Sequence, residues 1–150
     1  MLNKDNLIQY FSDGIKLKGS EKIGTEHEKF IYSKKDLSLI PFHGERSISA
    51  VLKKFIENSW DPIIEDEQIV GANKNQASIT LEPGGQFELS GAPLNNLHET
   101  CREINDHLSF TKSLEEEFDI GFLGIGYIPL GNFNDMPKVP KKRYQLVFKL

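Results

Sequence analysis

The most informative stretch for the architecture is ITLEPGGQFELS, which occupies residues 79–90 of the 150-residue chain. Apolar and polar residues alternate on both sides of the PGG run at residues 83–85, as they do in half-buried strands. A proline followed by two glycines interrupts a regular strand ladder, so the sequence predicts a bulge or sharp bend there. Beyond the bend, Phe87 and Leu89 would share one face of the strand, and Glu88 would lie on the other.

A second acidic strand is predicted over residues 22–33, KIGTEHEKFIYS, where the same alternation is found. Glu26 and Glu28 would project from one face, roughly 7 Å apart along the strand. His27 would point to the opposite face, where a partly buried structural histidine is the simplest interpretation. Two readings of the glutamates stay open. They are either exposed charges at a strand edge, or ligands for a hard cation such as Mg²⁺, which takes carboxylate oxygens.

The polar face of the strand after the bend allows the same two interpretations, exposed charges or metal ligands. Glu88 would share it with Gln86 and Ser90, whose side chains offer neutral hydrogen-bonding groups. Glu82 immediately precedes the bend, where glycine allows close approach of a ligand or of another backbone. A bulged surface strand with ordinary polar residues is the alternative. The two segments together predict a carboxylate-lined sheet face that either faces solvent or holds a metal ion.

Apolar spacing elsewhere completes the predicted architecture. We expect helices over residues 3–13, 45–60 and 93–118, a hairpin over 63–81 with its turn at 71–76, and a buried strand over 120–128. In the third helix, Cys101 would be a small core residue, and His98 and His107 would be surface residues. The order of elements favours an α+β fold, with a mainly antiparallel sheet and helices packed on one face.

Composition limits the classes of function. The net charge is −4 and the isoelectric point is near 5.6, which argues against non-specific nucleic-acid binding. No apolar run approaches the length of a membrane helix, and the N-terminus lacks the pattern of a signal peptide. A single cysteine cannot form an internal disulfide, so we expect a one-domain cytoplasmic protein.

Five segments together resemble the glutamate–cysteine ligases of plants and many proteobacteria. They are IGTEHEKF (23–30), ITLEPGGQFELSGAP (79–93), LHETC (97–101), GFLGIG (121–126) and PKVPKKRY (137–144). They occur in order from about residue 20 to about residue 144. The resemblance implies the glutamine synthetase-like catalytic sheet of a carboxylate–amine ligase, present here only in its N-terminal part. Residues 129–150 are expected to be a loop and a tail outside the family pattern.

The resemblance also implies a reaction. Enzymes of this family use ATP to join the γ-carboxylate of glutamate to the amine of cysteine through a γ-glutamyl phosphate, which is the first step of glutathione biosynthesis. The expected partners are therefore glutamate, cysteine and ATP, with no nucleic acid or membrane. The residues that the match assigns to Mg²⁺ or Mn²⁺ are Glu26, Glu28, Glu88 and, as a further candidate, Glu82. Gln86 and Ser90 would contact substrate.

The length departs from the family, whose members have several hundred residues. Most residues for ATP and for substrate glutamate should lie beyond this chain, which would then be a truncated form or a fragment. We therefore predict no ligase activity for residues 1–150 alone. The alternative is a non-catalytic remnant that retains only the metal-binding sheet face. An incomplete sheet would expose an unpaired edge and invite association.

Overall fold

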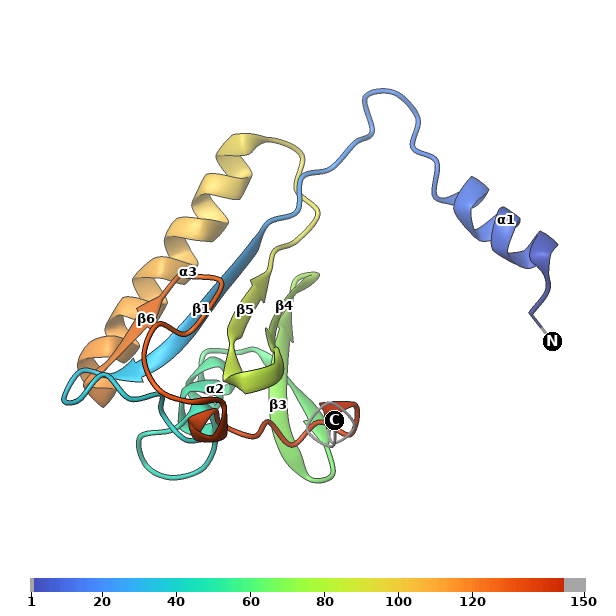
Figure 1. Ribbon diagram of the computed structural model, residues 1–150. Helices are drawn as coiled ribbons and strands as arrows, with labels where there is room; N and C mark the ends of the chain where they lie inside the picture. Colours follow the sequence, from blue (N-terminus) through green and yellow to red (C-terminus); the bar gives the residue numbers. More distant parts are fainter. Residues whose placement is uncertain (1, 145–150) are drawn as a thin grey trace.

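An antiparallel sheet of six strands forms the body of the protein in a computed structural model, which describes residues 2–144 (Figure 1). The strand order is β2-β3-β4-β5-β1-β6, and α2 and α3 pack on one face. The predicted α+β class is confirmed. The elements are α1 (Lys4–Asp13), β1 (Glu26–Ser33), α2 (Ile48–Glu57), β2 (Asp61–Glu65), β3 (Gln68–Lys74), β4 (Ala77–Leu81), β5 (Phe87–Ser90), α3 (Leu97–Phe118) and β6 (Ile120–Leu123), with short 3₁₀ turns at Pro83–Gly85 and Phe133–Asp135.

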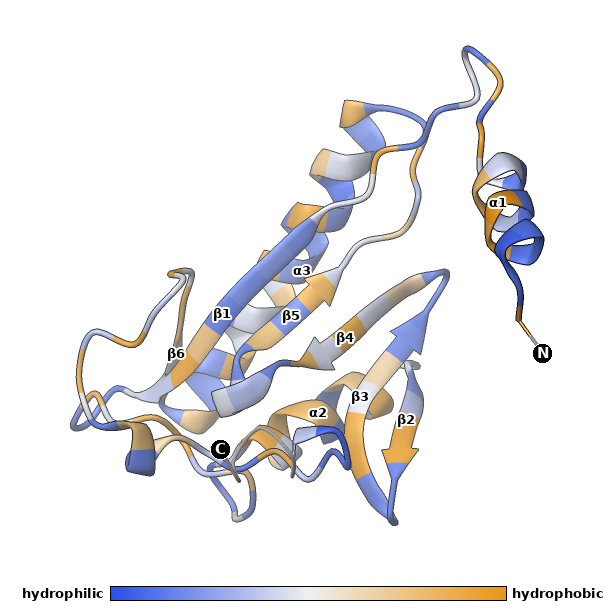
Figure 2. Ribbon diagram, turned by 45° about the vertical axis from the view of Figure 1, so that its right-hand side comes forward, coloured by the Kyte–Doolittle hydropathy of each residue, from blue (hydrophilic) through white to orange (hydrophobic). Residues whose placement is uncertain are grey.

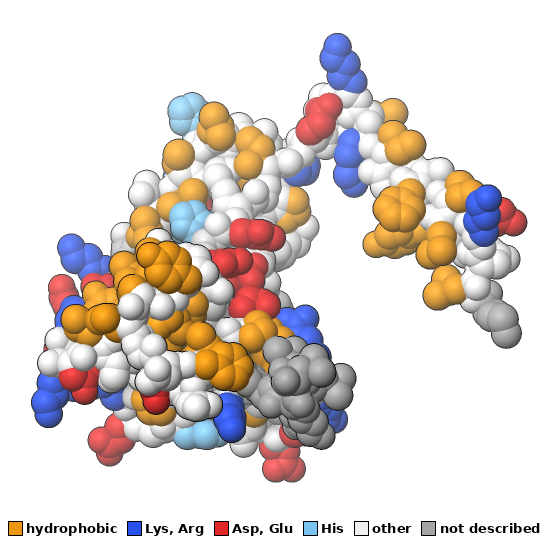
Figure 3. All heavy atoms as spheres, in the orientation of Figure 1, with side chains coloured by type: hydrophobic (Ala, Val, Ile, Leu, Met, Phe, Trp, Pro, Cys, Tyr) orange, Lys and Arg blue, Asp and Glu red, His pale blue; other side chains and the backbone are white. Residues whose placement is uncertain are grey.

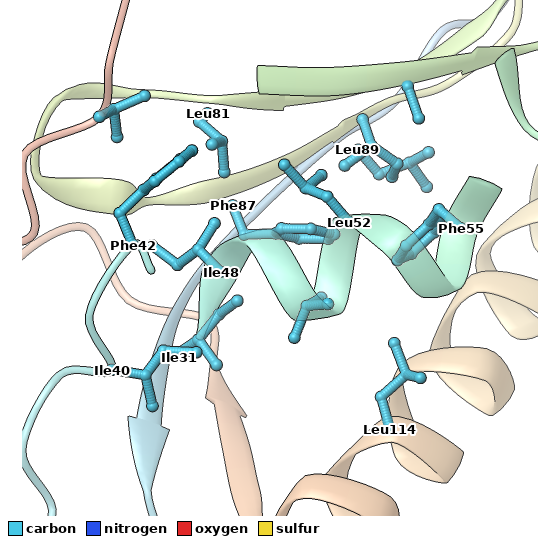
Figure 4. Packing of buried hydrophobic residues seen from close by; sticks show 14 of the residues in the cluster. Ile31, Ile40, Phe42, Ile48, Leu52, Phe55, Leu81, Phe87, Leu89 and Leu114 are labelled. Atoms are coloured by element: carbon cyan, nitrogen blue, oxygen red, sulfur yellow. The ribbon is translucent and has the colours of Figure 1, made fainter. Parts of the chain in front are cut away.

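The core lies between the sheet and α2. This helix begins after Ser47, whose hydroxyl accepts a hydrogen bond from the backbone N–H of Ala50 at 3.1 Å and so caps the first turn. Its apolar face carries Leu52 and Phe55, which point toward Phe87 in β5 (Figure 4). Burial of each such side chain contributes roughly 1.5–3 kcal/mol, so this contact fixes which face of β5 is turned inward.

The predicted hairpin over residues 63–81 was wrong in detail, because the chain turns twice there. Asp66 and Glu67 form one turn and Asn75 and Gln76 form another, and all four have positive φ, as expected for two-residue hairpin turns. The expected turn at 71–76 contains strand instead, since β3 continues through Gly71 to Lys74. A side chain at Gly71 would lie 2.5 Å from the backbone oxygen of Ile79, so this glycine serves close strand packing rather than a turn.

The bend between β4 and β5 is confirmed. Gly84 and Gly85 have φ of 81° and 77°, values that residues with a side chain rarely adopt. The backbone N–H of Glu82 donates to the oxygen of Gln86 at 2.8 Å and closes the bend. The chain therefore returns directly into β5, and the residues on either side of the bend lie in neighbouring strands.

The third helix was predicted with the wrong buried face. It begins at Leu97 with Asn96 as its cap, so Pro93 precedes the helix. Cys101 is exposed, whereas His107 is buried at 6% exposure. The side chains that α3 buries are Thr100, His107, Thr111 and Leu114. This mostly polar set packs on a strand face that is itself polar, whereas Leu97, Cys101 and Leu108 of the predicted apolar stripe lie on the exposed side of the helix.

Two terminal segments also differ from expectation. The predicted buried strand over 120–128 ends at Leu123, which is partly exposed, and the glycines at 124 and 126 lie in irregular chain. Residues 137–140 lie in irregular chain within the expected loop, but Val139 and the later Tyr144 are buried in the core. Residues 145–150 of the expected tail lie outside the described part of the chain. The helix α1 lies well away from the sheet in Figure 1 and in Figure 2, and it buries no side chain. Within residues 2–144, no helix is long and apolar enough to cross a membrane.

Both edges of the sheet carry features that oppose pairing with another strand. On β2, Pro62 lacks a backbone N–H, and the pairing with β3 shifts register between Ile63 and Ile64. On β6, the backbone N–H of Phe122 donates to a carboxylate oxygen of Glu115 at 2.9 Å. The expected association through an open edge would therefore have to displace this contact.

Replacing Glu115 with alanine tests the protection of the β6 edge. The change frees the N–H of Phe122, at a cost of about 1 kcal/mol, and leaves a donor that another strand can use. We expect concentration-dependent association in analytical ultracentrifugation. The matched control is Glu116→Ala, which removes the same charge from an exposed neighbour and should sediment like the wild type. Equal sedimentation of the two variants at every concentration would contradict the role assigned to Glu115.

Candidate metal-binding face of the sheet

Strand register brings the predicted glutamates together on the face away from the helices. Glu28 in β1 lies directly opposite Glu88 in β5, and Glu26 lies opposite Ser90. On the other side of β5, Thr80 in β4 lies opposite Glu88. Side chains of directly opposed residues start roughly 5 Å apart, so the carboxylates of Glu28 and Glu88 are neighbours.

Neutral side chains orient two of these carboxylates. Ser90 donates its hydroxyl to Glu88 Oε1 at 2.5 Å, and Thr80 donates to Glu88 Oε2 at 3.3 Å. Gln86 donates its amide to Glu28 Oε2 at 2.9 Å. Gln86 and Ser90, which were predicted to contact substrate, donate hydrogen bonds to the glutamates in this structure. Thr80 was missed by sequence analysis, and only the pairing of β4 with β5 could have revealed it.

In the described part of the chain, Glu26, Glu28 and Glu88 form no close ion pair. Acidic side chains gather in a column over β1 and β5 (Figure 3). None of the ion pairs within 4.0 Å among residues 2–144 includes Glu26, Glu28 or Glu88. Like charges directly opposed across strands repel each other. This face therefore carries negative charge that a bound cation would neutralise.

The side chains do not form a finished metal cage. Within the described residues, no group of three or more histidine, cysteine, aspartate or glutamate side chains converges closely enough to hold a metal ion. Such an arrangement is nevertheless compatible with Mg²⁺, which is commonly bound by one or two carboxylates together with substrate phosphates and water. The donor set of hard carboxylate oxygens therefore fits Mg²⁺ or Mn²⁺.

Glu82, at the end of β4, contacts the C-terminal segment. Its carboxylate pairs with Arg143 at 3.2 Å and accepts a hydrogen bond from the Tyr144 hydroxyl, also at 3.2 Å. The Tyr144 hydroxyl and the Lys141 ammonium also contact the backbone oxygen of Leu81, at 2.7 and 2.8 Å. In this structure, Glu82 therefore anchors the segment that follows residue 136 to the end of β4.

Two cavities flank the sheet, one on each face. An apolar cavity of about 250 Å³ is lined by Phe30 and Tyr32, which follow Glu26 and Glu28 on the same face of β1. A larger cavity of about 460 Å³, lined by Trp60 and His107, lies on the helix side. We assign the candidate site to the glutamate face, because the chemistry of a cation site resides in its oxygen donors rather than in the size of a hollow.

The comparison with known proteins agrees with this geometry. Residues 22–150 match the model of the Glutamate-cysteine ligase family 2 (GCS2). The chain belongs to this family. The matched region contains β1 and β5, and thus all the glutamates of the candidate face, and it extends beyond Tyr144, where the sequence motifs end.

Plant ligases of the family are similar over nearly the whole chain. Over 149 residues, the chain is 48% identical to the chloroplastic glutamate–cysteine ligase of Medicago truncatula. The alignment covers 99% of this chain and 29% of that protein. It is 45% identical to glutamate–cysteine ligase A, chloroplastic, of Oryza sativa subsp. japonica and 44% identical to the chloroplastic enzyme of Arabidopsis thaliana, each over 97% of this chain. The chain thus spans less than a third of the length of these relatives. Their names place them in the chloroplast, and the cytoplasmic location stays a prediction for this chain.

Behind the glutamate face, β1 makes an unusual polar contact with α3. Lys29 Nζ lies 3.0 Å from His107 Nε2, and both side chains are buried. An ammonium group has no acceptor, so Nε2 must accept and Nδ1 must carry the imidazole hydrogen. Burial, followed by the neighbouring charges of Lys29 and His27, lowers the pKa of His107 to about 3. Burial also lowers the pKa of Lys29 to about 8. At pH 7, the contact therefore joins an ammonium to a neutral imidazole.

The low pKa of His107 predicts that stability falls with acid. An unfolded histidine binds a proton near pH 6.5, whereas folded His107 does so only near pH 3. Between these values the unfolded state holds more protons, so stability rises with pH and is fully present above about pH 6.5. We expect a loss of about 2 kcal/mol from this group between pH 7 and pH 5. Urea unfolding at the two pH values should show a smaller loss in His107→Gln, and equal losses in both proteins would contradict the assignment.

Proposed function

We propose that this chain is the metal-binding N-terminal part of a catalytic domain that ligates glutamate to cysteine. The observation that carries the proposal is the pairing of Glu28 with Glu88 on the outer sheet face, where neither carboxylate forms an ion pair within 4.0 Å among residues 2–144. Membership of the family adds the reaction class. Residues 1–150 form one unit in this proposal, and the relatives' length leaves room for the groups that bind ATP and substrate glutamate.

In the proposed reaction, ATP phosphorylates the γ-carboxylate of glutamate, and the amine of cysteine then displaces phosphate to form γ-glutamylcysteine. A bound Mg²⁺ or Mn²⁺ would neutralise phosphate oxygens during phosphoryl transfer. Glu26, Glu28 and Glu88 would supply carboxylate ligands to bound Mg²⁺ or Mn²⁺ ions, with one or two of them at each ion. Ser90, Thr80 and Gln86 keep the carboxylates of Glu88 and Glu28 oriented through the hydrogen bonds described above. The glutamates bind and position, and none of them is required as a general base.

A chimera tests the proposal in a complete enzyme. The part of the Medicago truncatula ligase that matches this chain would be replaced by the 149 residues of the chain that align with it. We expect ATP- and Mg²⁺-dependent formation of γ-glutamylcysteine, and a loss in kcat/KM on the order of 100-fold in the Glu88→Gln chimera, because a group that stabilises transition-state charge is removed.

The matched control is Glu45→Gln in the same chimera, which removes an exposed carboxylate outside the candidate face and should keep full activity. A folded chimera without activity would contradict the assignment of this chain to the catalytic domain. Full activity of the Glu88→Gln chimera would contradict the role of the sheet face. The isolated chain is expected to form no product in the same assay.

A further inference from the structure

The strand that carries Glu26 and Glu28 has a second polar face. His27 and Lys29 alternate with the glutamates and therefore point to the opposite side of the sheet, toward α3. His27 is half buried, and its ring lies 6.5 Å from that of His107, centroid to centroid. Lys29 is only 7% exposed. The glutamates thus occupy the outer face of a strand whose inner face is also polar.

Helix α3 contacts both strands of the glutamate pair. His107 Nε2 accepts a hydrogen bond from the ammonium of Lys29 in β1 at 3.0 Å. Glu103, four residues earlier on α3, accepts the backbone N–H of Ala92 at 2.8 Å, two residues after the end of β5. Lys29 lies opposite Phe87, so Ala92 is five residues farther along the sheet than the partner of Lys29. The two contacts therefore hold α3 at two separated points of the strands.

The polar contacts of Lys29, His107 and Glu103 between the strands and α3 form a seam. This seam costs free energy of folding, because it contains buried polar atoms without hydrogen bonds. Within residues 2–144, the buried side-chain nitrogen and oxygen atoms without a hydrogen-bond partner are Thr25 Oγ1, Glu103 Oε2 and His107 Nδ1. All three belong to the same seam, because Thr25 Oγ1 and Glu103 Oε2 both lie within 3 Å of where a side chain on Gly91 would begin. Well-packed apolar residues would usually make such a seam at least as stable. Polar groups kept at this cost are expected where function constrains them.

We propose that the seam of Lys29, His107 and Glu103 positions the two strands that bind the metal ion, with Lys29 as the positioning residue on β1. The inference rests on the proposed function, since it concerns the same metal site. Lys29 acts from the far face of the sheet and touches neither metal nor substrate. By holding β1 against α3, it sets how Glu28 stands relative to Glu88.

Because Lys29 is positively charged, the direction of the change in cation affinity on its removal distinguishes a positioning role from a purely electrostatic one. Removal of a positive charge near a cation site should strengthen cation binding if charge alone matters. Loss of positioning should weaken it. Lys29→Met keeps the apolar stem and removes the buried ammonium, so the variant should fold. We expect about fivefold weaker Mn²⁺ binding to the 150-residue chain, measured by electron paramagnetic resonance of free Mn²⁺, while urea unfolding shows a cooperative transition and therefore a folded variant.

Matched variants separate positioning from general damage. His107→Gln keeps an acceptor for the ammonium and should bind Mn²⁺ within about twofold of the wild type, whereas His107→Phe should bind it more weakly. Lys53→Met removes the same charge from an exposed position on α2 and should leave the affinity unchanged. If Lys29→Met binds Mn²⁺ as tightly as the wild type or more tightly, the positioning role of the seam is wrong, while the proposed function is unaffected. Absence of Mn²⁺ binding by the wild type would overturn the proposed function as well.

Discussion

Replacement of Gly85 by alanine is expected to destabilise the protein by roughly 2–5 kcal/mol, which is a large part of the stability of a typical domain. Gly85 has a φ of 77°, where a side chain adds strain of about 1–2 kcal/mol. A Cβ atom would also lie 2.6 Å from Pro137 Cγ and 2.7 Å from Ile48 Cδ1. Gly85 therefore lies where the bend, the start of α2 and the C-terminal segment meet, and no space is left there for a side chain.

The measurement is urea unfolding of the wild type and of Gly85→Ala, followed by circular dichroism. Gly126→Ala is the matched control, because a Cβ atom there meets nothing within 4 Å, and its effect should stay within about 0.5 kcal/mol. Because Glu88 follows the bend closely, Gly85→Ala should also reduce metal binding. Unfolding midpoints that agree between the two variants would show that the bend tolerates a side chain.

Local patterns were sufficient for much of the fold. Alternation around residues 83–85 predicted the bend and both flanking strands, because glycine and proline restrict the backbone independently of distant contacts. The amphipathic spacing of Leu52 and Phe55 predicted α2, although the helix is shorter than expected and begins after Ser47. The turn at Asp66 and Glu67 was missed, since these residues carry no glycine or proline signal, whereas the turn at Asn75 and Gln76 lies within the predicted range of 71–76.

The burial of α3 could not be predicted from its own sequence. Hydrophobic periodicity assumes that a helix packs on an apolar surface, and here the opposing strand presents His27 and Lys29. The helix therefore buries His107 and Thr111, while Leu97 is 67% exposed. Only the joint placement of β1 and α3 reveals that the two polar faces match.

For the candidate site, alternation placed Glu26 and Glu28 on one face and Glu88 on a polar face. It could not place them together, because strand order and register depend on contacts far apart in sequence. The structure pairs Glu28 with Glu88 and Glu26 with Ser90. It places Glu82 with Arg143 instead, a contact that the separation of 61 residues hides from any local pattern.

The double variant Glu28→Gln/Glu88→Gln is expected to lose metal binding almost completely. Glutamine has nearly the shape of glutamate, so Gln86 and Ser90 keep neighbours of the same size, while both opposed charges disappear. Changes in outer contacts of metal sites alone cost about 10–100-fold in affinity, so the loss of two ligands should cost at least about 100-fold. Glu45→Gln/Glu116→Gln removes the same charge from exposed positions elsewhere.

Isothermal titration of Mn²⁺ into these three proteins tests most directly whether the sheet face of β1 and β5 binds metal. The predicted result is measurable binding by the wild type and by the Glu45/Glu116 control, with at least about 100-fold weaker binding by the Glu28/Glu88 variant. The same affinity in all three proteins would contradict the assignment of the metal to this face.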